Sequence, residues 1–115
     1  MNIIEKVIKR LSYEARVKSF IKDSENMVNY YTSLMPNNVI GKEEILRTLH
    51  SIEVDLVFLT EYKKEYKNTK NENYKRFIRK LVREISKKER KVRNLIGQNR
   101  NFFIHIYSLQ TVKTK

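Results

Sequence analysis

Only two glycines and one proline occur among the 115 residues of this chain. The turns of a β-protein depend on such residues, so their scarcity argues against a sheet. Long segments instead repeat apolar residues with the 3.6-residue period of an α-helix. We therefore predict an all-α fold, a helical bundle of about four to five helices in which residues 1–115 form a single domain.

The first helical pattern covers about residues 2–35, where apolar positions recur at spacings of three and four. Asp23 and Ser24 interrupt it with two residue types that favour helix N-termini, so we predict a kink or break there. Pro36 ends the segment. The apolar pair that follows, Val39 and Ile40, is expected to pack under the loop.

A second pattern begins near Gly41, which is followed by acids where the helix dipole favours them. Its apolar residues alternate spacings of four and three, as in a coiled-coil seam: Ile45, Leu49, Ile52, Leu56 and Leu59. A polar linker, residues 68–73, leads to a third pattern over residues 74–96. Gly97 ends that helix, and Asn99 is a candidate N-cap for another.

Positive charge is concentrated in the later part of the sequence. Residues 1–73 hold 12 Lys and Arg against 11 Asp and Glu, whereas residues 74–115 hold 13 against 2. Most of these cations lie on the polar face of the third predicted helix: Lys75, Arg76, Arg79, Lys80, Arg83, Lys87, Arg90, Lys91 and Arg93. Uncompensated charge of one sign repels itself and favours a polyanionic partner. We predict that these nine residues bind nucleic acid, with RNA favoured, rather than serving only as a solvated face.

Metal, disulfide and membrane chemistry fit the sequence poorly. The chain has no cysteine and two histidines, without zinc-type spacing. No apolar run approaches the roughly 18 residues that a membrane span requires, and the first residues lack the apolar core of a signal peptide. The apolar face of the basic helix is needed for the core rather than for lipid. We expect a cytoplasmic, intracellular protein with no metal, no cofactor and no membrane partner.

A short motif follows the basic helix. If a helix restarts near Asn99, Arg100 lies in its first turn, where free N–H groups and the helix dipole favour an anion. Asn101 and His105 are four residues apart and share a face, which places the amide to orient the imidazole. Tyr107 lies two turns beyond Arg100 on another common face. An arginine, a histidine and an anion-binding helix end together suit phosphodiester chemistry.

The spacing Arg-Asn-x3-His-x-Tyr resembles the signature of the HEPN superfamily of small helical ribonucleases, most closely its HepT-type toxin branch. The resemblance is confined to residues 95–107 and implies three catalytic positions, Arg100, Asn101 and His105. Arg100 would stabilise the scissile phosphate, and His105 would be the general acid and base for the ribose 2′-hydroxyl, without a metal ion. The resemblance also implies a homodimer with facing motifs, and an antitoxin nucleotidyltransferase that modifies Tyr107.

Three functions remain open. The first is a metal-independent HEPN-like endoribonuclease, the toxin of a toxin–antitoxin or defence system. The second is a non-enzymatic basic helical-bundle protein that binds DNA or RNA, as a viral or plasmid packaging or regulatory factor. The third is a helical module whose basic face binds an acidic protein surface. Cleavage of RNA separates the first from the others, and the salt dependence of nucleic-acid binding separates the second from the third.

Overall fold

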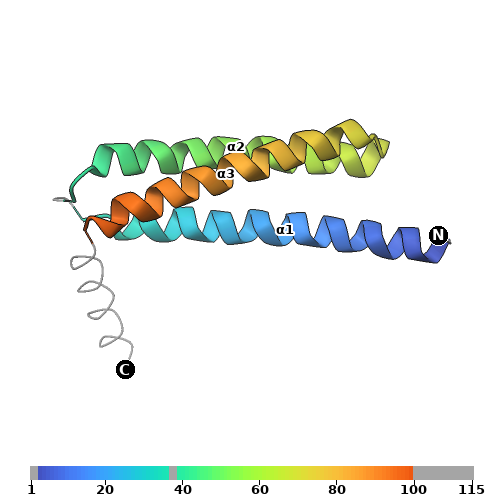
Figure 1. Ribbon diagram of the computed structural model, residues 1–115, viewed down its shortest axis with the longest axis horizontal. Helices are drawn as coiled ribbons and strands as arrows, with labels where there is room; N and C mark the ends of the chain where they lie inside the picture. The colour runs from blue at the N-terminus through green and yellow to red at the C-terminus, as the bar shows by residue number, and fades with distance from the viewer. Residues whose placement is uncertain (1–2, 37–38, 100–115) are drawn as a thin grey trace, which may run out of the picture.

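The computed structural model describes residues 3–36 and 39–99 of the chain. These residues form three α-helices, α1 (Ile3–Leu34), α2 (Lys42–Thr69) and α3 (Glu72–Gly97), with no strand in either range. Figure 1 shows α2 running back antiparallel to α1, while α3 returns along both. The predicted all-α class is therefore confirmed.

The predicted number of helices is wrong for the part of the chain that the structure describes, which has three rather than four to five. The predicted number was too high partly because a kink or break was expected at Asp23 and Ser24. In the structure, α1 is continuous there. Ser24 is buried, and its hydroxyl donates a hydrogen bond of 2.6 Å to Glu89 Oε1 of α3. It therefore links two helices instead of starting one. The helix expected after Gly97 lies at residues 100–115, outside the described ranges.

The core is built around the seam that the sequence predicted on α2. All five seam residues are at most 4% exposed: Ile45, Leu49, Ile52, Leu56 and Leu59. From α3, the core receives Ile78, Ile85 and Val92, which are spaced by one heptad each. A seven-residue apolar repeat keeps one face of a helix against its partner. The prediction for α2 is confirmed. The seven-residue repeat of α3 explains how α3 packs against the core.

The α1–α2 connection holds the N-terminus of α2 through Gly41. This residue has φ 74°, in the left-handed region that favours glycine. A Cβ at this position would meet Leu95 Cδ2 at 3.9 Å, an ordinary contact, so backbone conformation rather than space favours glycine here. Val39 is buried as expected, but Ile40 is 67% exposed, so only one of the pair packs under the loop.

The α2–α3 connection is a tight turn, shorter than the polar linker suggested. Lys70 adopts φ 58°, and its N–H bonds to Tyr66 O at 2.8 Å, which closes α2. The side chain of Asn71 then caps α3 by accepting a hydrogen bond of 2.9 Å from the N–H of Asn73. The turn places α3 antiparallel to α2.

Candidate nucleic-acid interface

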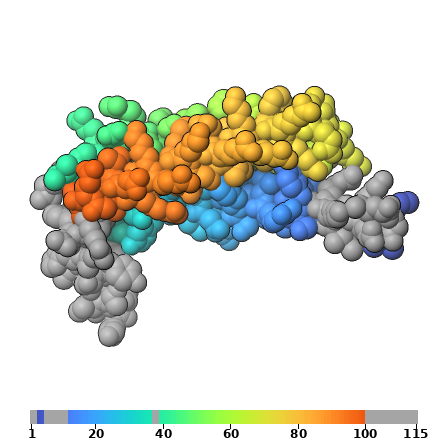
Figure 2. All heavy atoms as spheres, in the orientation of Figure 1, coloured from blue at the N-terminus to red at the C-terminus, as the bar shows by residue number. Residues whose placement is uncertain are grey.

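Six cations form a continuous band along the outer side of α3, here called the basic stripe: Arg76, Arg79, Lys80, Arg83, Lys87 and Arg90. All six are exposed. Their spacing places them on one helical face, directly opposite the buried face that carries Ile85. Figure 2 shows α3 crossing the front of the molecule with its outer surface open. The core contacts of α3 therefore force this charge into solvent.

Most cations of the basic stripe have no carboxylate partner in the part of the chain that the structure describes. Within it, only Lys87 lies near a carboxylate among the described residues, at 3.9 Å from Glu84 Oε1, and both side chains are well exposed. The Cβ atoms of residues three or four apart on a helix are about 5–6 Å apart, so the charged groups of the stripe lie within reach of one another at the Debye length of about 8 Å in physiological salt. Salt therefore screens their mutual repulsion incompletely, and a bound polyanion would relieve it.

Two lysines at the edge of α3 pair with acids of α2 instead. Lys91 Nζ lies 2.9 Å from Glu44 Oε1, and Lys88 Nζ lies 2.6 Å from Asp55 Oδ2 in a part-buried pair. Lys91 was predicted to bind nucleic acid, whereas Lys88 was not. The sequence of α3 alone gave no signal for these pairs, because the acids come from another helix. The charge of Lys91 is therefore partly compensated by Glu44.

Lys75 occupies a different setting from the other predicted cations. Its Nζ lies 4.9 Å from the ring centroid of Tyr13 on α1 and 5.2 Å from that of Tyr66 on α2, and it pairs with Glu72 at 3.6 Å. These contacts join three helices at one end of the bundle. A hydrogen bond with Tyr66 is the main cause that raises the pKa of Lys75 above its usual 10.5. Lys75 therefore has a structural role in addition to any contact with a ligand.

This lysine–tyrosine cluster predicts a loss of stability in alkali. Burial raises the pKa of Tyr13 above its usual 10.0, so both Tyr13 and Lys75 hold their protons more tightly in the folded chain than in the unfolded one. Their contribution to stability is complete below about pH 10 and falls as pH rises through the raised pKa values. Urea unfolding at pH 9 and 11 should show a smaller pH-dependent loss in a Tyr13→Phe, Lys75→Met variant than in the wild type. Equal pH-dependent losses of stability in the variant and the wild type would contradict the raised pKa values.

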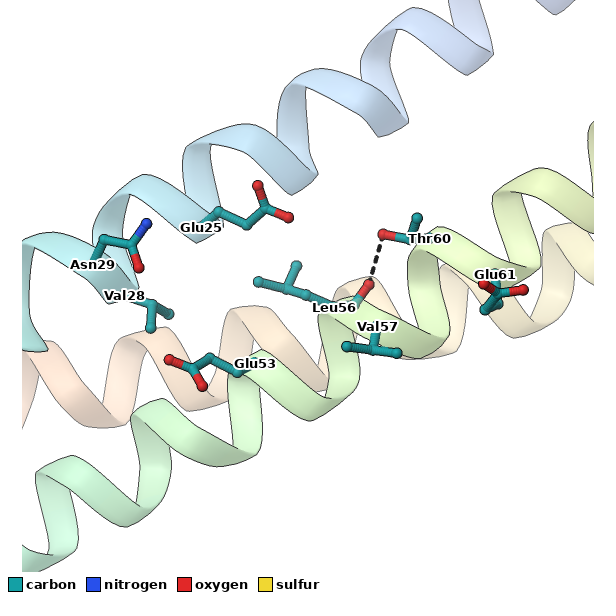
Figure 3. Close-up of a pocket in the computed structure, with 8 residues that line it drawn as sticks. All are labelled: Glu25, Val28, Asn29, Glu53, Leu56, Val57, Thr60 and Glu61. Atoms are coloured by element: carbon teal, nitrogen blue, oxygen red, sulfur yellow. Dashed lines mark hydrogen bonds between the residues drawn. The ribbon is translucent and has the colours of Figure 1, made fainter.

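A groove between α1 and α2 lies on the other side of the molecule. Figure 3 looks into it, with α3 passing behind and with Glu25 and Glu53 on opposite walls. This part has a volume of about 390 Å³ and also includes Glu61, so its charge disfavours phosphates. The adjoining part, reached past Thr60, is lined by Glu14 and by four lysines: Lys18, Lys63, Lys64 and Lys67. These lysines form a second, smaller basic surface. It is the alternative to the basic stripe as a binding surface for an anionic ligand.

The catalytic motif predicted from the sequence begins where the described residues end. Arg100, Asn101, His105 and Tyr107 all lie outside the described ranges, so their predicted roles stay predictions. Asn99, just before them, is held by the α1–α2 loop. Its Nδ2 donates to Ile40 O at 3.0 Å, and its Oδ1 accepts from Ile40 N at 3.0 Å. The point from which the motif starts is thus fixed to the bundle.

In the described ranges, no cluster of three or more His, Asp and Glu side chains is placed to hold a metal ion. None of the three helices is long and apolar enough to cross a membrane. Comparison of the chain with protein-family models, curated proteins and solved structures finds no match. The resemblance to the HEPN signature therefore rests on the motif alone.

Proposed function

We propose that this protein binds nucleic acid, with RNA favoured, through the basic stripe of α3. The observation that carries the proposal is the set of six exposed cations on one helical face, of which only Lys87 lies near a described carboxylate. From Arg76 to Arg90 the stripe is about 21 Å long, at 1.5 Å per helical residue. A row of this length suits the regularly spaced phosphates of a nucleic-acid backbone.

A polyanion fits the stripe better than the other partners that the sequence left open. An acidic protein surface would need several carboxylates in a matching row, whereas nucleic acid supplies one negative charge at every nucleotide. Lipid binding by an amphipathic helix requires an apolar face to insert. In α3 that face is used by the core through Ile78, Ile85 and Val92. Outside the core, Phe77 at the edge of the charged face is the large apolar side chain of α3 that stays exposed, and a single ring is not an inserting face.

The proposal predicts a strong salt dependence of RNA binding. If all six stripe cations neutralise phosphates of a single strand, log K should fall against log salt with a slope of about −4, from roughly 0.7 per phosphate. Fluorescence anisotropy with a labelled RNA 20-mer at 50–400 mM salt measures this slope. Absence of binding at 50 mM salt would contradict the proposal, and so would an affinity that salt does not change.

As a second function, we propose that the bound RNA is cleaved by Arg100 and His105, as the HEPN resemblance implies. The supporting observation is that α3 leads from the basic stripe to Asn99, whose side chain is held by Ile40, and that Arg100 follows at once. RNA held along the stripe would then extend toward the motif. His105 would exchange a proton with the 2′-hydroxyl or the leaving 5′-oxygen, and Arg100 would stabilise the charge on the phosphate.

This second proposal also includes the homodimer, the toxin role and the partner nucleotidyltransferase acting on Tyr107. One arginine and one histidine per chain supply few groups for a reaction that needs a general acid, a general base and charge stabilisation. A second copy would double the supply. Cleavage of a mixed RNA pool should persist in the presence of a chelator and stop when the substrate has no 2′-hydroxyl. Intact RNA after prolonged incubation would contradict cleavage, and RNA binding would remain as the proposed function.

A further inference from the structure

Three aromatic side chains contact one another where α2 and α3 meet near their shared turn: Tyr62, Tyr74 and Phe77. Together with Phe58 of α2 they are here called the aromatic patch. The ring centroids of Tyr62 and Phe77 are 5.3 Å apart, and those of Tyr62 and Tyr74 are 6.2 Å apart. Tyr74 and Phe77 meet edge to face at 6.1 Å. Phe58 lies one turn before Tyr62, on the same side of α2. The three contacting rings hold one another in place.

The inner side of the aromatic patch is anchored and its outer side is open. Tyr62 and Tyr74 are partly buried against the hydrophobic core. Phe77 is 46% exposed and Phe58 is 51% exposed. This exposure is unfavourable in water, because the side chain of phenylalanine has no polar group. Single exposed apolar side chains are common on soluble proteins, but adjoining ones mark interaction sites. The patch therefore offers fixed ring surface to a ligand.

The aromatic patch borders the basic stripe. Lys80 of the stripe follows Phe77 by three residues, so their side chains are neighbours on α3. Glu84, one turn beyond Lys80, is the acid on this side of the helix, and its Oε1 lies 3.9 Å from Lys87. A ligand that spans both surfaces would place negative charge on Lys80 and planar, apolar groups on the rings. Unpaired nucleotides have both properties, because bases stack on aromatic side chains while phosphates meet cations.

We propose that the nucleic acid held by the basic stripe is single-stranded, and that its unpaired bases stack on Phe77 and Phe58. The inference rests on the proposed nucleic-acid binding and adds which form of nucleic acid is bound. A duplex keeps its bases stacked inside the helix, so it would offer the patch only backbone. A second copy of this chain is disfavoured as the occupant, because it would bring two basic stripes together in a protein of net charge +12.

The test replaces both phenylalanines by leucine, which keeps an apolar side chain and good helix propensity but removes the flat ring. Anisotropy is measured with a single-stranded RNA 20-mer and with a blunt RNA duplex of the same length. The Phe58→Leu, Phe77→Leu variant should bind the single strand at least about 5-fold more weakly, the lower end of the range for losing the stacking of one base. Its duplex binding and its salt slope should match the wild type. The Phe58→Tyr, Phe77→Tyr variant should retain single-strand binding.

The outcomes separate this inference from the function on which it rests. Wild-type affinity in the leucine variant, with a normal salt slope, would overturn the stacking role and leave nucleic-acid binding standing. Tighter binding of duplex than of single strand by the wild type would also overturn it. No RNA binding by the wild type at low salt would remove both proposals. Sedimentation that shows a wild-type dimer and a monomeric leucine variant would assign the patch to a second copy instead.

Discussion

Replacing His105 with alanine is expected to lower the rate of RNA cleavage on the order of a hundredfold or more, the usual cost of losing a general acid or base. Arg100→Ala should have a similar effect, because the charge that develops on the phosphate would lose its stabilisation. RNA binding should change far less in both variants, since we propose that the basic stripe supplies most of it. Single-turnover cleavage of a labelled RNA with excess protein measures the rate apart from binding.

Two controls make this prediction specific. Arg100→Lys keeps the charge but loses the planar fork of donors, so it should not restore cleavage. Thermal unfolding of His105→Ala should match the wild type, because the predicted role of His105 is chemical. A less stable His105→Ala variant with undiminished cleavage would assign the residue a structural role. A wild-type protein that binds RNA without cutting it would end the ribonuclease proposal.

Replacing Arg79, Arg83 and Arg90 with glutamine is expected to weaken binding of single-stranded RNA about fiftyfold at 0.15 M salt. Without three neutralised phosphates, the slope of log K against log salt becomes shallower by about 2. Relative to a 1 M reference, this corresponds to an affinity about fiftyfold weaker at 0.15 M salt. Equilibrium anisotropy at 0.15 M salt measures the change directly.

The fold should survive these three changes. All three side chains are exposed, and none forms an ion pair with a described carboxylate. They lie on the face of α3 opposite Ile78, Ile85 and Val92, so the buried contacts of α3 stay as they are. Circular dichroism of the variant should show wild-type helix content and an unfolding temperature that is not lower. A variant that unfolds early would mean that these arginines support the bundle, contrary to the structure.

The main features of the fold are predictable because they depend on local patterns. The seam of α2 has a coiled-coil spacing that only a helix presents on one side, and all of its residues are buried. The end of α1 just before Pro36 follows from a residue that ends helices, and α3 ends at Gly97 as predicted. The continuity of α1 was not predictable in this way. A serine favours a helix start unless a partner elsewhere binds its hydroxyl, and that partner, Glu89, is 65 residues away.

The candidate site shows the same division between local and distant causes. Which face of α3 is basic follows from its periodicity, and the structure confirms that this face is exposed. Which cations are already engaged does not follow from it. Lys75 depends on tyrosines of α1 and α2, and Lys91 depends on Glu44. The aromatic patch likewise depends on α2 and α3 meeting at Tyr62 and Phe77.

The most direct test compares two variants that lose equal charge on different surfaces. One is the α3 variant with Arg79, Arg83 and Arg90 replaced by glutamine, and the other replaces Lys18, Lys64 and Lys67 of the α1–α2 groove by glutamine. Each lowers the net charge of +12 by three. The slope of log K against log salt for RNA should become shallower by about 2 in the α3 variant and stay at the wild-type value in the groove variant. Equal slopes in the two variants, or a change confined to the groove variant, would contradict binding by the basic stripe.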